Sequence, residues 1–272
     1  MSKAFKGKTA LITGSSSGIG RATAILLASK GCNVIICGRR AEHLEQTKSE
    51  CMKVGLSSEQ IVTLLGDQND ENHRKALIEA AISKFNGLDI LVNNAGTVVR
   101  KPDLEQTMSD YDHLFNTNLR SVVHLTQLAL PHLIASKGTI VNVSSISSQF
   151  WYGSNLFYSM TKAAMDAYTK GLALDLASKG VRVNAVNPGP IKTDIGREYG
   201  QSSAEVFNTL LQSQPNGRVG QPREVAEAIV FLAGSKSDFI TGVCLTIDGG
   251  QLLTSNMSYL MRASAKEEIS QN

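Results

Sequence analysis

Three side chains that can hold or move a proton lie near one another in the second half of the chain. Tyr158 and Lys162 are four residues apart, so on a helix the phenol and the ammonium group share one face. A tyrosine hydroxyl titrates near pH ~10, and acid/base chemistry near neutrality needs a lower value, which a neighbouring lysine cation favours. A Tyr-x-x-x-Lys pair alone is also common on structural helices. The upstream Ser145, whose hydroxyl could bind a substrate oxygen, strengthens the prediction of a catalytic site.

A glycine-rich turn near the start of the chain predicts a phosphate-binding site. The segment Thr13-Gly14-Ser15-Ser16-Ser17-Gly18-Ile19-Gly20 follows a predicted strand and leads into a predicted helix. Its glycines permit a tight turn and close approach of the backbone, and the helix start offers free N–H groups to a pyrophosphate. No lysine follows the glycines, which argues against a nucleotide-triphosphate loop and ATP hydrolysis.

The residues after the second predicted strand indicate which dinucleotide would bind. An NAD site usually places an acidic residue roughly 20 residues beyond the glycines, to hold the ribose hydroxyls. Here the chain has Gly38-Arg39-Arg40 instead. The cation of Arg39 suits a 2′-phosphate and predicts NADP(H). We interpret Arg40 as a solvated residue at the start of a helix.

Short β-branched runs alternate with amphipathic segments over most of the chain, which predicts a parallel sheet covered by helices on both faces. The expected fold is α/β, with a doubly wound seven-stranded parallel sheet in a single domain over residues 1–253. Residues 190–220 are read as a substrate-binding insertion and 254–272 as a polar tail. The predicted strands are Thr9–Thr13, Asn33–Cys37, Ile61–Leu65, Ile90–Asn93, Thr139–Val143, Arg182–Val186 and Val243–Ile247. The predicted helices are Arg21–Ser29, Ala41–Met52, Glu71–Phe85, Leu119–Leu133, Ser159–Ala177 and Pro222–Leu232.

Composition narrows the function classes. The 272 residues are 42% hydrophobic, and 27 basic against 24 acidic residues give a net charge of +3 without a basic block. We therefore expect no nucleic-acid or membrane partner. The absence of a signal-like or membrane-spanning apolar run predicts a cytoplasmic protein. The four cysteines show no CxxC spacing and do not cluster with the histidines, so no metal site is expected.

The motifs in combination resemble those of the short-chain dehydrogenase/reductase family. They occur in the family's order and cover residues 8 to 250. This resemblance implies a Rossmann-type fold and an oxidoreductase that moves a hydride between NADP(H) and a carbonyl or alcohol. The motifs are Thr13-Gly14-x-x-x-Gly18-x-Gly20, Asn93-Asn94-Ala95-Gly96, Ser145, Tyr158-x-x-x-Lys162 and Asn187-Pro188-Gly189.

The resemblance also implies a role for each matching residue. Tyr158 would be the general acid, and Lys162 would lower its pKa and hold the nicotinamide ribose. Ser145 would bind the carbonyl oxygen, and Asn118 would order a water in the proton relay. Asp67 would meet the adenine amino group. The Ile191 backbone and the Thr193 hydroxyl would hold the carboxamide of nicotinamide. The full predicted cofactor set is Gly14, Ser15, Ser17, Gly18, Ile19, Gly20, Arg39, Asp67, Gln68, Asn94, Ala95, Gly96, Tyr158, Lys162, Pro188, Gly189, Ile191 and Thr193.

One departure from the family pattern concerns the cofactor phosphate. Many NADP-using relatives carry a basic residue just before the second glycine of the turn, where this chain has Ser17. Arg39 would therefore hold the 2′-phosphate with less help.

Aromatic residues gather where the substrate would bind. Phe150, Trp151, Tyr152 and Phe157 lie between Ser145 and Tyr158, and Tyr199 and Phe207 lie in the irregular segment. In a chain that is 6% aromatic, this density predicts an apolar pocket wall. The predicted substrate-binding residues are Ser145, Trp151, Tyr152 and Tyr158. A hydrophobic ketone, a quinone, a steroid or an acyl thioester would each fit.

Other readings stay open at this point. A catalytically silent dinucleotide-binding protein could use the same fold for regulation or assembly. A Rossmann-type methyltransferase would share the glycine turn but has no need of Ser145, Tyr158 and Lys162 together. The family resemblance also implies a homotetramer or dimer, in which the Leu119–Leu133 and Ser159–Ala177 helices pack against their symmetry mates.

Overall fold

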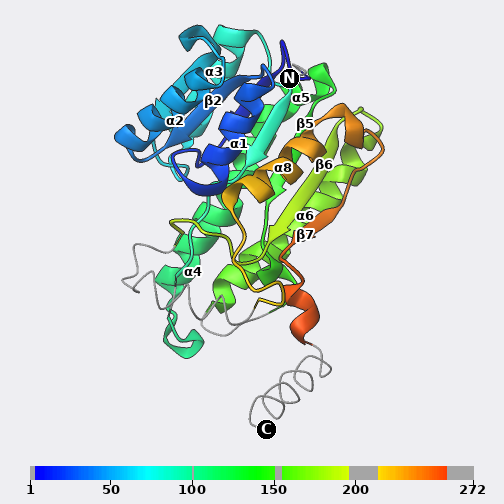
Figure 1. The fold of residues 1–272 in the computed structure, drawn as a ribbon. Coiled ribbons are helices and arrows are strands. Elements are labelled where there is room, and N and C mark those ends of the chain that lie inside the picture. Colours follow the sequence, from blue (N-terminus) through cyan, green and yellow to red (C-terminus); the bar gives the residue numbers. More distant parts are fainter. Residues whose placement is uncertain (1–3, 100, 151–154, 196–213, 256–272) are drawn as a thin grey trace.

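A seven-stranded parallel sheet forms the centre of the protein (Figure 1). The computed structural model describes residues 4–99, 101–150, 155–195 and 214–255. The strands are ordered β3-β2-β1-β4-β5-β6-β7, and each neighbouring pair is parallel. The strand order therefore reverses beside β1, and ligands bind at such a switch point in doubly wound sheets. The strands are β1 (Thr9–Ile12), β2 (Asn33–Gly38), β3 (Ile61–Leu65), β4 (Ile90–Asn93), β5 (Thr139–Val143), β6 (Arg182–Pro188) and β7 (Cys244–Ile247).

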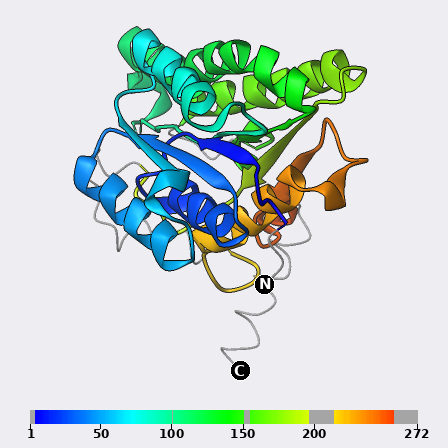
Figure 2. The same ribbon diagram turned by 90° about the horizontal axis from the view of Figure 1, so that it is seen from above.

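Helices cover both faces of the sheet (Figure 2). One face packs against α1 (Gly18–Ser29), α2 (Ala41–Lys53) and α8 (Pro222–Ala233). The opposite face packs against α3 (Glu71–Phe85), α5 (Ser121–Ser136) and α6 (Leu156–Ala177). Successive side chains of a strand point to opposite faces, so Ala10 and Ile12 of β1 join the first core and Leu11 joins the second. Because both faces of the sheet are buried, the strands are nearly continuous runs of apolar residues.

The predicted fold class is confirmed, and the element bounds differ by a few residues. The structure begins α1 at Gly18 and α6 at Leu156, and it extends β6 to Pro188. The single helix predicted over Leu119–Leu133 is wrong in its start. The helical region begins earlier, with α4 (Met108–Phe115), and continues through a π-helical turn over Asn116–Arg120 into α5. A capping box in which Thr107 and Asp110 bond reciprocally starts α4, and this Thr-x-x-Asp signal was readable in the sequence.

The predicted insertion over residues 190–220 is partly described. Its two ends lie side by side, because Ile191 forms an isolated parallel bridge with Gly220. Lys192 N donates to Gly220 O at 2.9 Å, and Gly220 N donates to Pro190 O at 2.9 Å. The segment therefore leaves and returns at the carboxyl end of β6. Residues 196–213 lie outside the described residues.

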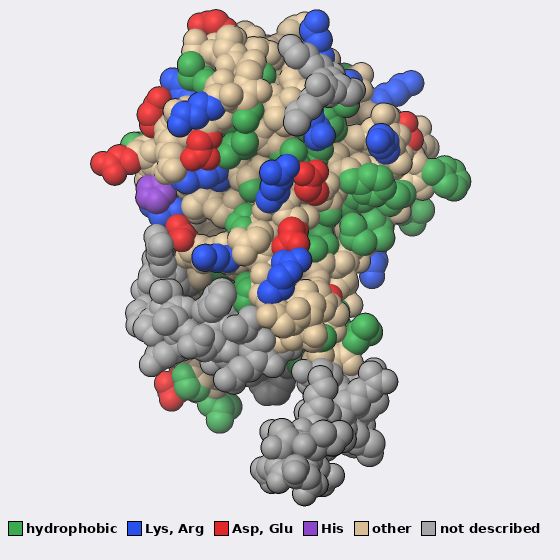
Figure 3. Space-filling model, viewed as in Figure 1, with side chains coloured by type: hydrophobic (Ala, Val, Ile, Leu, Met, Phe, Trp, Pro, Cys, Tyr) green, Lys and Arg blue, Asp and Glu red, His purple; other side chains and the backbone are tan. Residues whose placement is uncertain are grey.

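The surface carries charges of both signs (Figure 3). Lysine and arginine side chains alternate with aspartate and glutamate over the face shown, and hydrophobic side chains gather on its right side. Within the described residues, none of the helices is both long and apolar enough to span a membrane. The same part of the chain holds no cluster of three potential metal ligands.

Candidate active site

The glycine turn between β1 and α1 packs directly on the segment that follows β4. A Cβ added at Gly20 would lie 2.4 Å from both Asn94 Nδ2 and Gly14 O. One added at Gly14, whose φ is +64°, would lie 2.9 Å from Ala95 Cα. Thr13 joins the two segments, because its Oγ1 accepts from Asn94 N at 3.0 Å and from Ala95 N at 2.9 Å. Side chains at these glycines would force the turn and the Asn94–Gly96 segment apart.

The N-cap side chain does not bond to the N–H groups in the first turn of α1. Ser17 stands at the N-cap position but makes no capping hydrogen bond, and the first turn holds no acidic residue. The unpaired N–H groups and the positive end of the helix dipole make such a terminus suited to an anion. Gly18, Ile19 and Gly20 are therefore placed to receive a pyrophosphate.

Arg40 stands at the start of a helix with a side chain that is 40% exposed, as interpreted from the sequence, and it also contacts this turn. Its Nη2 donates to Ser17 Oγ at 2.9 Å, and its Nη1 lies 3.7 Å from Asp194 Oδ2. Arg40 is at the N-cap position of α2, so the start of this helix lies beside the glycine turn. Arg39, directly after β2, is exposed. Of the two arginines, Arg40 is the one whose guanidinium contacts the glycine turn.

Ser15 has a structural role in place of the predicted phosphate contact. It is fully buried. Its hydroxyl donates to Ile12 O at 3.0 Å and accepts from Cys37 N at 2.9 Å, while its own N–H donates to Cys37 O at 3.0 Å. The hydroxyl and N–H of Ser15 are thus used to join the glycine turn to β1 and β2, and its carbonyl oxygen accepts from Thr47 of α2. Residue type alone could not distinguish this inward serine from its neighbours.

The predicted adenine-side residues follow β3. Asp67 is half-buried, and its Oδ1 accepts from Asn69 N at 2.9 Å. The side chain of Gln68 turns inward and donates to Cys37 Sγ at 3.3 Å. Asp67 thus presents a carboxylate at the carboxyl edge of the sheet, whereas Gln68 can offer only its backbone there.

Tyr158 and Lys162 lie one turn apart on α6, as predicted. Tyr158 is 9% exposed and packs against Val98, Val99 and Leu114. Lys162 is buried, its Nζ donates to Val143 O at 2.8 Å, and it lies 5.6 Å from the ring centre of Tyr158. Burial lowers the pKa of Lys162 to about 8, and the carboxylate of Asp166 opposes this shift. The lysine is therefore a cation at neutral pH beside the phenol ring.

Asn118 belongs to the π-helical turn between α4 and α5 and is fully buried. Its Oδ1 accepts from Thr97 N at 2.8 Å, and its Nδ2 donates to Thr97 O at 2.9 Å. A Cβ added at Gly96 would lie 3.3 Å from Asn118 Oδ1 and 3.7 Å from Lys162 Nζ. The absence of a side chain at Gly96 therefore lets Asn118 and Lys162 approach the same space.

Ser145 lies at the carboxyl edge of β5, where it caps a short 3₁₀ turn over Ile146–Ser148. Its Oγ accepts from Ser147 N at 3.1 Å. The preceding Ser144 donates from Oγ to Lys162 O at 3.2 Å, which ties this edge to α6. The structure thus brings the carboxyl end of β5 against the helix that carries Tyr158 and Lys162.

The segment after β6 closes over the glycine turn. Pro188 ends β6, and Gly189 packs tightly on Asp248, because an added Cβ would lie 2.8 Å from Asp248 Cβ. Thr193 lies over Gly18, where an added Cβ would be 3.1 Å from Thr193 Cγ2. Thr193 therefore lies over the glycine turn, and Ile191 lies two residues before it against Gly220.

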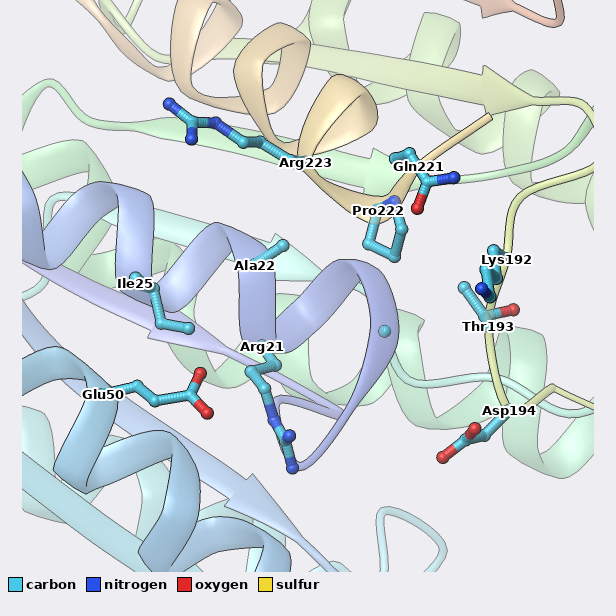
Figure 4. Close-up of a pocket in the computed structure, with 11 residues that line it drawn as sticks. Arg21, Ala22, Ile25, Glu50, Lys192, Thr193, Asp194, Gln221, Pro222 and Arg223 are labelled. Atoms are coloured by element: carbon cyan, nitrogen blue, oxygen red, sulfur yellow. The ribbon is translucent and has the colours of Figure 1, made fainter. Parts of the chain in front are cut away.

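A cavity of about 370 Å³ lies beside this contact (Figure 4). It is formed by the outer side of α1, the Lys192–Asp194 segment and the start of α8. The described lining residues include none of the four predicted catalytic side chains, so this cavity is separate from the catalytic groups. Its lining is Gly18, Arg21, Ala22, Ile25, Glu50, Lys192, Thr193, Asp194, Gln221, Pro222 and Arg223.

The predicted aromatic wall is only partly described. Phe150 is 39% exposed. Phe157 instead belongs to an aromatic cluster, with its ring centre 5.4 Å from that of Tyr111, so it supports the packing of α4 on α6. Trp151, Tyr152, Tyr199 and Phe207 lie outside the described residues.

The described groups form one chemical unit at the carboxyl edge of the sheet. A phenol and a buried ammonium group on α6 and a serine hydroxyl after β5 lie at the edge of the sheet where the glycine turn offers helix N–H groups and the Arg40 guanidinium. Such a set can bind a dinucleotide and exchange a proton with a substrate oxygen.

Comparison with known proteins supports this reading. A family model described as enoyl-(acyl carrier protein) reductase matches residues 14–251. A tropinone reductase homolog of Arabidopsis thaliana is 38% identical over 258 residues, which cover 94% of this chain and 96% of the relative. A 3-oxoacyl acyl-carrier-protein reductase of Thermotoga maritima is 36% identical and covers 92% of this chain and 99% of the relative. An L-xylulose reductase of Mesocricetus auratus is also 36% identical, covering 93% and 100%.

A solved structure agrees with the sequence relatives. It is a short-chain dehydrogenase/reductase of unknown function from Caenorhabditis elegans, determined with cofactor. It aligns with a TM-score of 0.88 and 38% identity, and the alignment covers 92% of this chain and 97% of the other.

Proposed function

The chain belongs to the short-chain dehydrogenase/reductase family, and from this premise we propose that it transfers a hydride between NADP(H) and the carbonyl or alcohol group of an apolar small molecule. Members of the family are oxidoreductases that use a nicotinamide dinucleotide. We propose the NADP preference, the residue roles and the substrate class described below.

The residues at this edge of the sheet fit such a cofactor. The glycine turn leaves space where a Cβ would clash, and the first turn of α1 has uncapped N–H groups for a pyrophosphate. Gly96 leaves space beside Lys162 and Asn118. When bound, the nicotinamide ring supplies or accepts the hydride. The proposed contacts are the glycine turn for the pyrophosphate, Asp67 for the adenine, Lys162 for the ribose, and Ile191 with Thr193 for the carboxamide.

We assign Tyr158 as the general acid in carbonyl reduction and the general base in the reverse direction. Its phenol gives a proton to the substrate oxygen as negative charge develops there. The nearby Lys162 cation stabilises the phenolate that this leaves. Ser145 donates a hydrogen bond to the same oxygen, and Asn118 holds the Thr97 backbone and orders a water that returns the proton to the site.

NADP preference is proposed from the cations near the end of β2. A 2′-phosphate is best bound by guanidinium groups, which form paired charge-assisted hydrogen bonds. The chain places Arg39 and Arg40 there, and Arg40 contacts Ser17 of the glycine turn. No acidic residue follows β2 in the sequence before Glu42, so the usual ribose partner of NAD is missing at this position.

The substrate is proposed to be a carbonyl compound with an apolar body. The aromatic residues Phe150, Trp151 and Tyr152 precede the helix of Tyr158 in the sequence, which supports Trp151 and Tyr152 as substrate contacts. The names of the relatives refer to tropinone, 3-oxoacyl acyl carrier protein and L-xylulose. These three carbonyl types define a first panel of test substrates.

The observation that carries the proposal is the placement of Lys162 5.6 Å from the Tyr158 ring and against Gly96. The test is the oxidation of NADPH and of NADH with the panel of carbonyl compounds. Turnover that is faster with NADPH supports the proposal. Tight cofactor binding without any turnover would favour the catalytically silent alternative instead.

We also propose a homo-oligomer in a reducing, cytoplasmic compartment. Ala163 and Ala167 are exposed on α6 and Leu174 is 80% exposed on the same helix, and small side chains let two helices approach closely. All four cysteines are unpaired, which suits a compartment that keeps thiols reduced.

A further inference from the structure

A buried carboxylate lies one turn beyond Lys162 on α6. Asp166 is 8% exposed. Its Oδ2 accepts from Asn187 Nδ2 at 2.8 Å and from Ser148 Oγ at 2.5 Å. A buried carboxylate is costly unless hydrogen bonds or charges compensate it, and bonds to a charged acceptor are stronger than neutral ones. Asn187 and Ser148 are thus both held by Oδ2, while Oδ1 is buried without a hydrogen-bond partner among the described residues.

Both partners of Asp166 bind the main chain of Ser145. Asn187 Nδ2 donates to Ser145 O at 3.2 Å, and Ser148 N donates to the same oxygen at 3.0 Å. Asn187 Nδ2 also lies 2.9 Å from Ser148 Oγ, so its two hydrogens are shared among three acceptors. The four residues thus form one hydrogen-bonded unit that joins the end of β6, the turn after β5, and α6.

The position of this unit links Ser145 to the helix that carries the other proposed catalytic groups. Tyr158, Lys162 and Asp166 follow one another at intervals of four residues, so they share one side of α6. Ser145 itself lies on a different element. A hydrogen-bonded connection from α6 to the Ser145 backbone fixes the separation of its hydroxyl from the phenol, and catalysis depends steeply on such separations.

We propose that Asp166 is a positioning residue for Ser145, which it orients through Asn187 and Ser148. The inference rests on the proposed function, because it assigns a role in the same hydride transfer. Asp166 does not contact the substrate. Its removal would let the Ser145–Ser148 turn move, and the hydrogen bond to the developing oxyanion would weaken more than substrate binding does.

The first test compares Asp166→Ala with Asp166→Asn in the full chain, using NADPH and whichever carbonyl of the panel wild type reduces. Asp166→Ala removes the hydrogen bonds that Asn187 and Ser148 donate to a charged group, so it should lower kcat by about ten-fold or more. The NADPH Kd should change by less than about two-fold, since no cofactor contact is lost. Asp166→Asn should restore kcat to within about three-fold of wild type, because an amide oxygen can accept the same two bonds. Asp175→Ala removes an exposed carboxylate from the same helix and serves as the control with wild-type kcat.

A second measurement needs no substrate. Hydrogen exchange of the backbone over residues 144–150, followed by mass spectrometry, should speed up in Asp166→Ala and stay slow in Asp166→Asn, without a comparable change over β1 or β4. Unchanged exchange over 144–150 in Asp166→Ala overturns the inference. If Asp166→Ala does not fold, Ser148→Ala removes one of the two bonds to the carboxylate and should give the same two effects at smaller size; wild-type kcat and exchange in that variant overturn the inference too.

Ser145→Ala separates the inference from the proposed function. If Ser145→Ala retains full turnover, the proposed role of Ser145 fails. If Ser145→Ala loses turnover while Asp166→Ala keeps the wild-type kcat, only the positioning role of Asp166 fails.

Discussion

Arg40 Nη2 donates a hydrogen bond of 2.9 Å to Ser17 Oγ. Ser17 stands where many NADP-using relatives have a basic residue, and Arg40 brings a cation to this place from the start of α2. The missing positive charge of the glycine turn is thus replaced from a different element. Arg39 and Arg40 together form the proposed 2′-phosphate site.

Arginine removal should reduce NADPH binding selectively. Because charge-assisted hydrogen bonds are lost, Arg39→Ala should raise the NADPH Kd by about ten-fold or more, and Arg40→Ala by about three-fold or more. The NADH Kd should barely change in either variant. Fluorescence titration with both cofactors measures this, and Lys53→Ala, at the far end of α2, controls for net charge. Equal losses for NADPH and NADH would mean that the arginines only support the fold.

Tyr158→Phe should abolish turnover and leave the cofactor Kd nearly unchanged. The phenol proton matters only as charge develops on the substrate oxygen, and the aromatic ring that packs against Val98, Val99 and Leu114 is retained. Steady-state kinetics and cofactor titration check both parts. Tyr168→Phe, a half-buried tyrosine on the same helix, should keep wild-type turnover. Residual activity above a few per cent in Tyr158→Phe would refute the acid assignment.

Gly20→Ala should prevent cofactor binding. The new Cβ would lie 2.4 Å from Gly14 O and from Asn94 Nδ2, so the glycine turn and the segment after β4 must separate. Gly87→Ala is the matched control, because nothing lies within 4 Å of a Cβ there. Thermal unfolding and NADPH titration of both variants measure the difference. Normal NADPH affinity in Gly20→Ala would contradict the close packing described.

The stability of the protein should depend on the pH through Lys162. Burial lowers its pKa to about 8, whereas an unfolded lysine titrates near ~10.4. Below pH 8 both states are protonated, and the folded state bears the full cost of burying the cation. As the pH rises from about 8 to about 10.4, the folded state loses the proton first and this cost disappears. Wild type should therefore gain about 3 kcal/mol relative to Lys162→Met between pH 7 and pH ~10.5.

Urea unfolding of both proteins without cofactor, at several pH values, measures this change. The hydrogen bond from Lys162 to Val143 O is lost in the variant at every pH, so the change of the stability difference with pH reports the titration of Lys162. A stability difference that stays constant with pH would show that burial does not lower the pKa of Lys162. Lys162→Met should also weaken cofactor binding, because the proposed ribose contact is lost.

Ala167→Arg should dissociate the proposed oligomer. Ala163 and Ala167 are exposed on one stripe of α6 with Leu174, and an arginine there would hold two helices apart. Sedimentation velocity at micromolar concentration should show wild type as an oligomer and the variant as a smaller species. A monomeric wild type would reject the oligomer altogether. Lys179→Ala, at the end of the same helix region, should leave the assembly intact.

The sequence predicted the sheet well because its strands are buried on both faces. Val34, Ile35 and Ile36 are all fully buried, so apolar runs bounded by glycine and polar residues marked the strands. The start of α6 was less visible, since Leu156 and Phe157 precede the polar residues that show helical periodicity. The π-helical turn at Asn116–Arg120 depends on how neighbouring elements pack, and periodicity does not report it.

The sequence predicted the spacing of candidate site residues whose type the chemistry requires. It did not predict which way a side chain points where two nearby residues have the same type. Tyr158 and Lys162 lie as the spacing predicted. Ser15 and Ser17 have the same side chain, yet one hydroxyl is buried against β2 and the other accepts from Arg40. Arg39 and Arg40 are likewise identical in type. Tertiary contacts decide which of two residues of the same type lies at the site. A single sequence does not contain these contacts.

The π-helical turn that carries Asn118 sets a limit on how this region can change in length. An α-helix advances by about 100° per residue, and a π-helical turn holds one residue more than an α-helical turn. Deleting one residue within Asn116–Arg120 would convert this turn to α-helix and rotate everything on one side of it relative to the other. Either Asn118 would leave Thr97, or the buried Leu125, Ala129 and Leu133 of α5 would turn from the core. Homologous chains should therefore vary in residue type along this helix while keeping its residue count fixed.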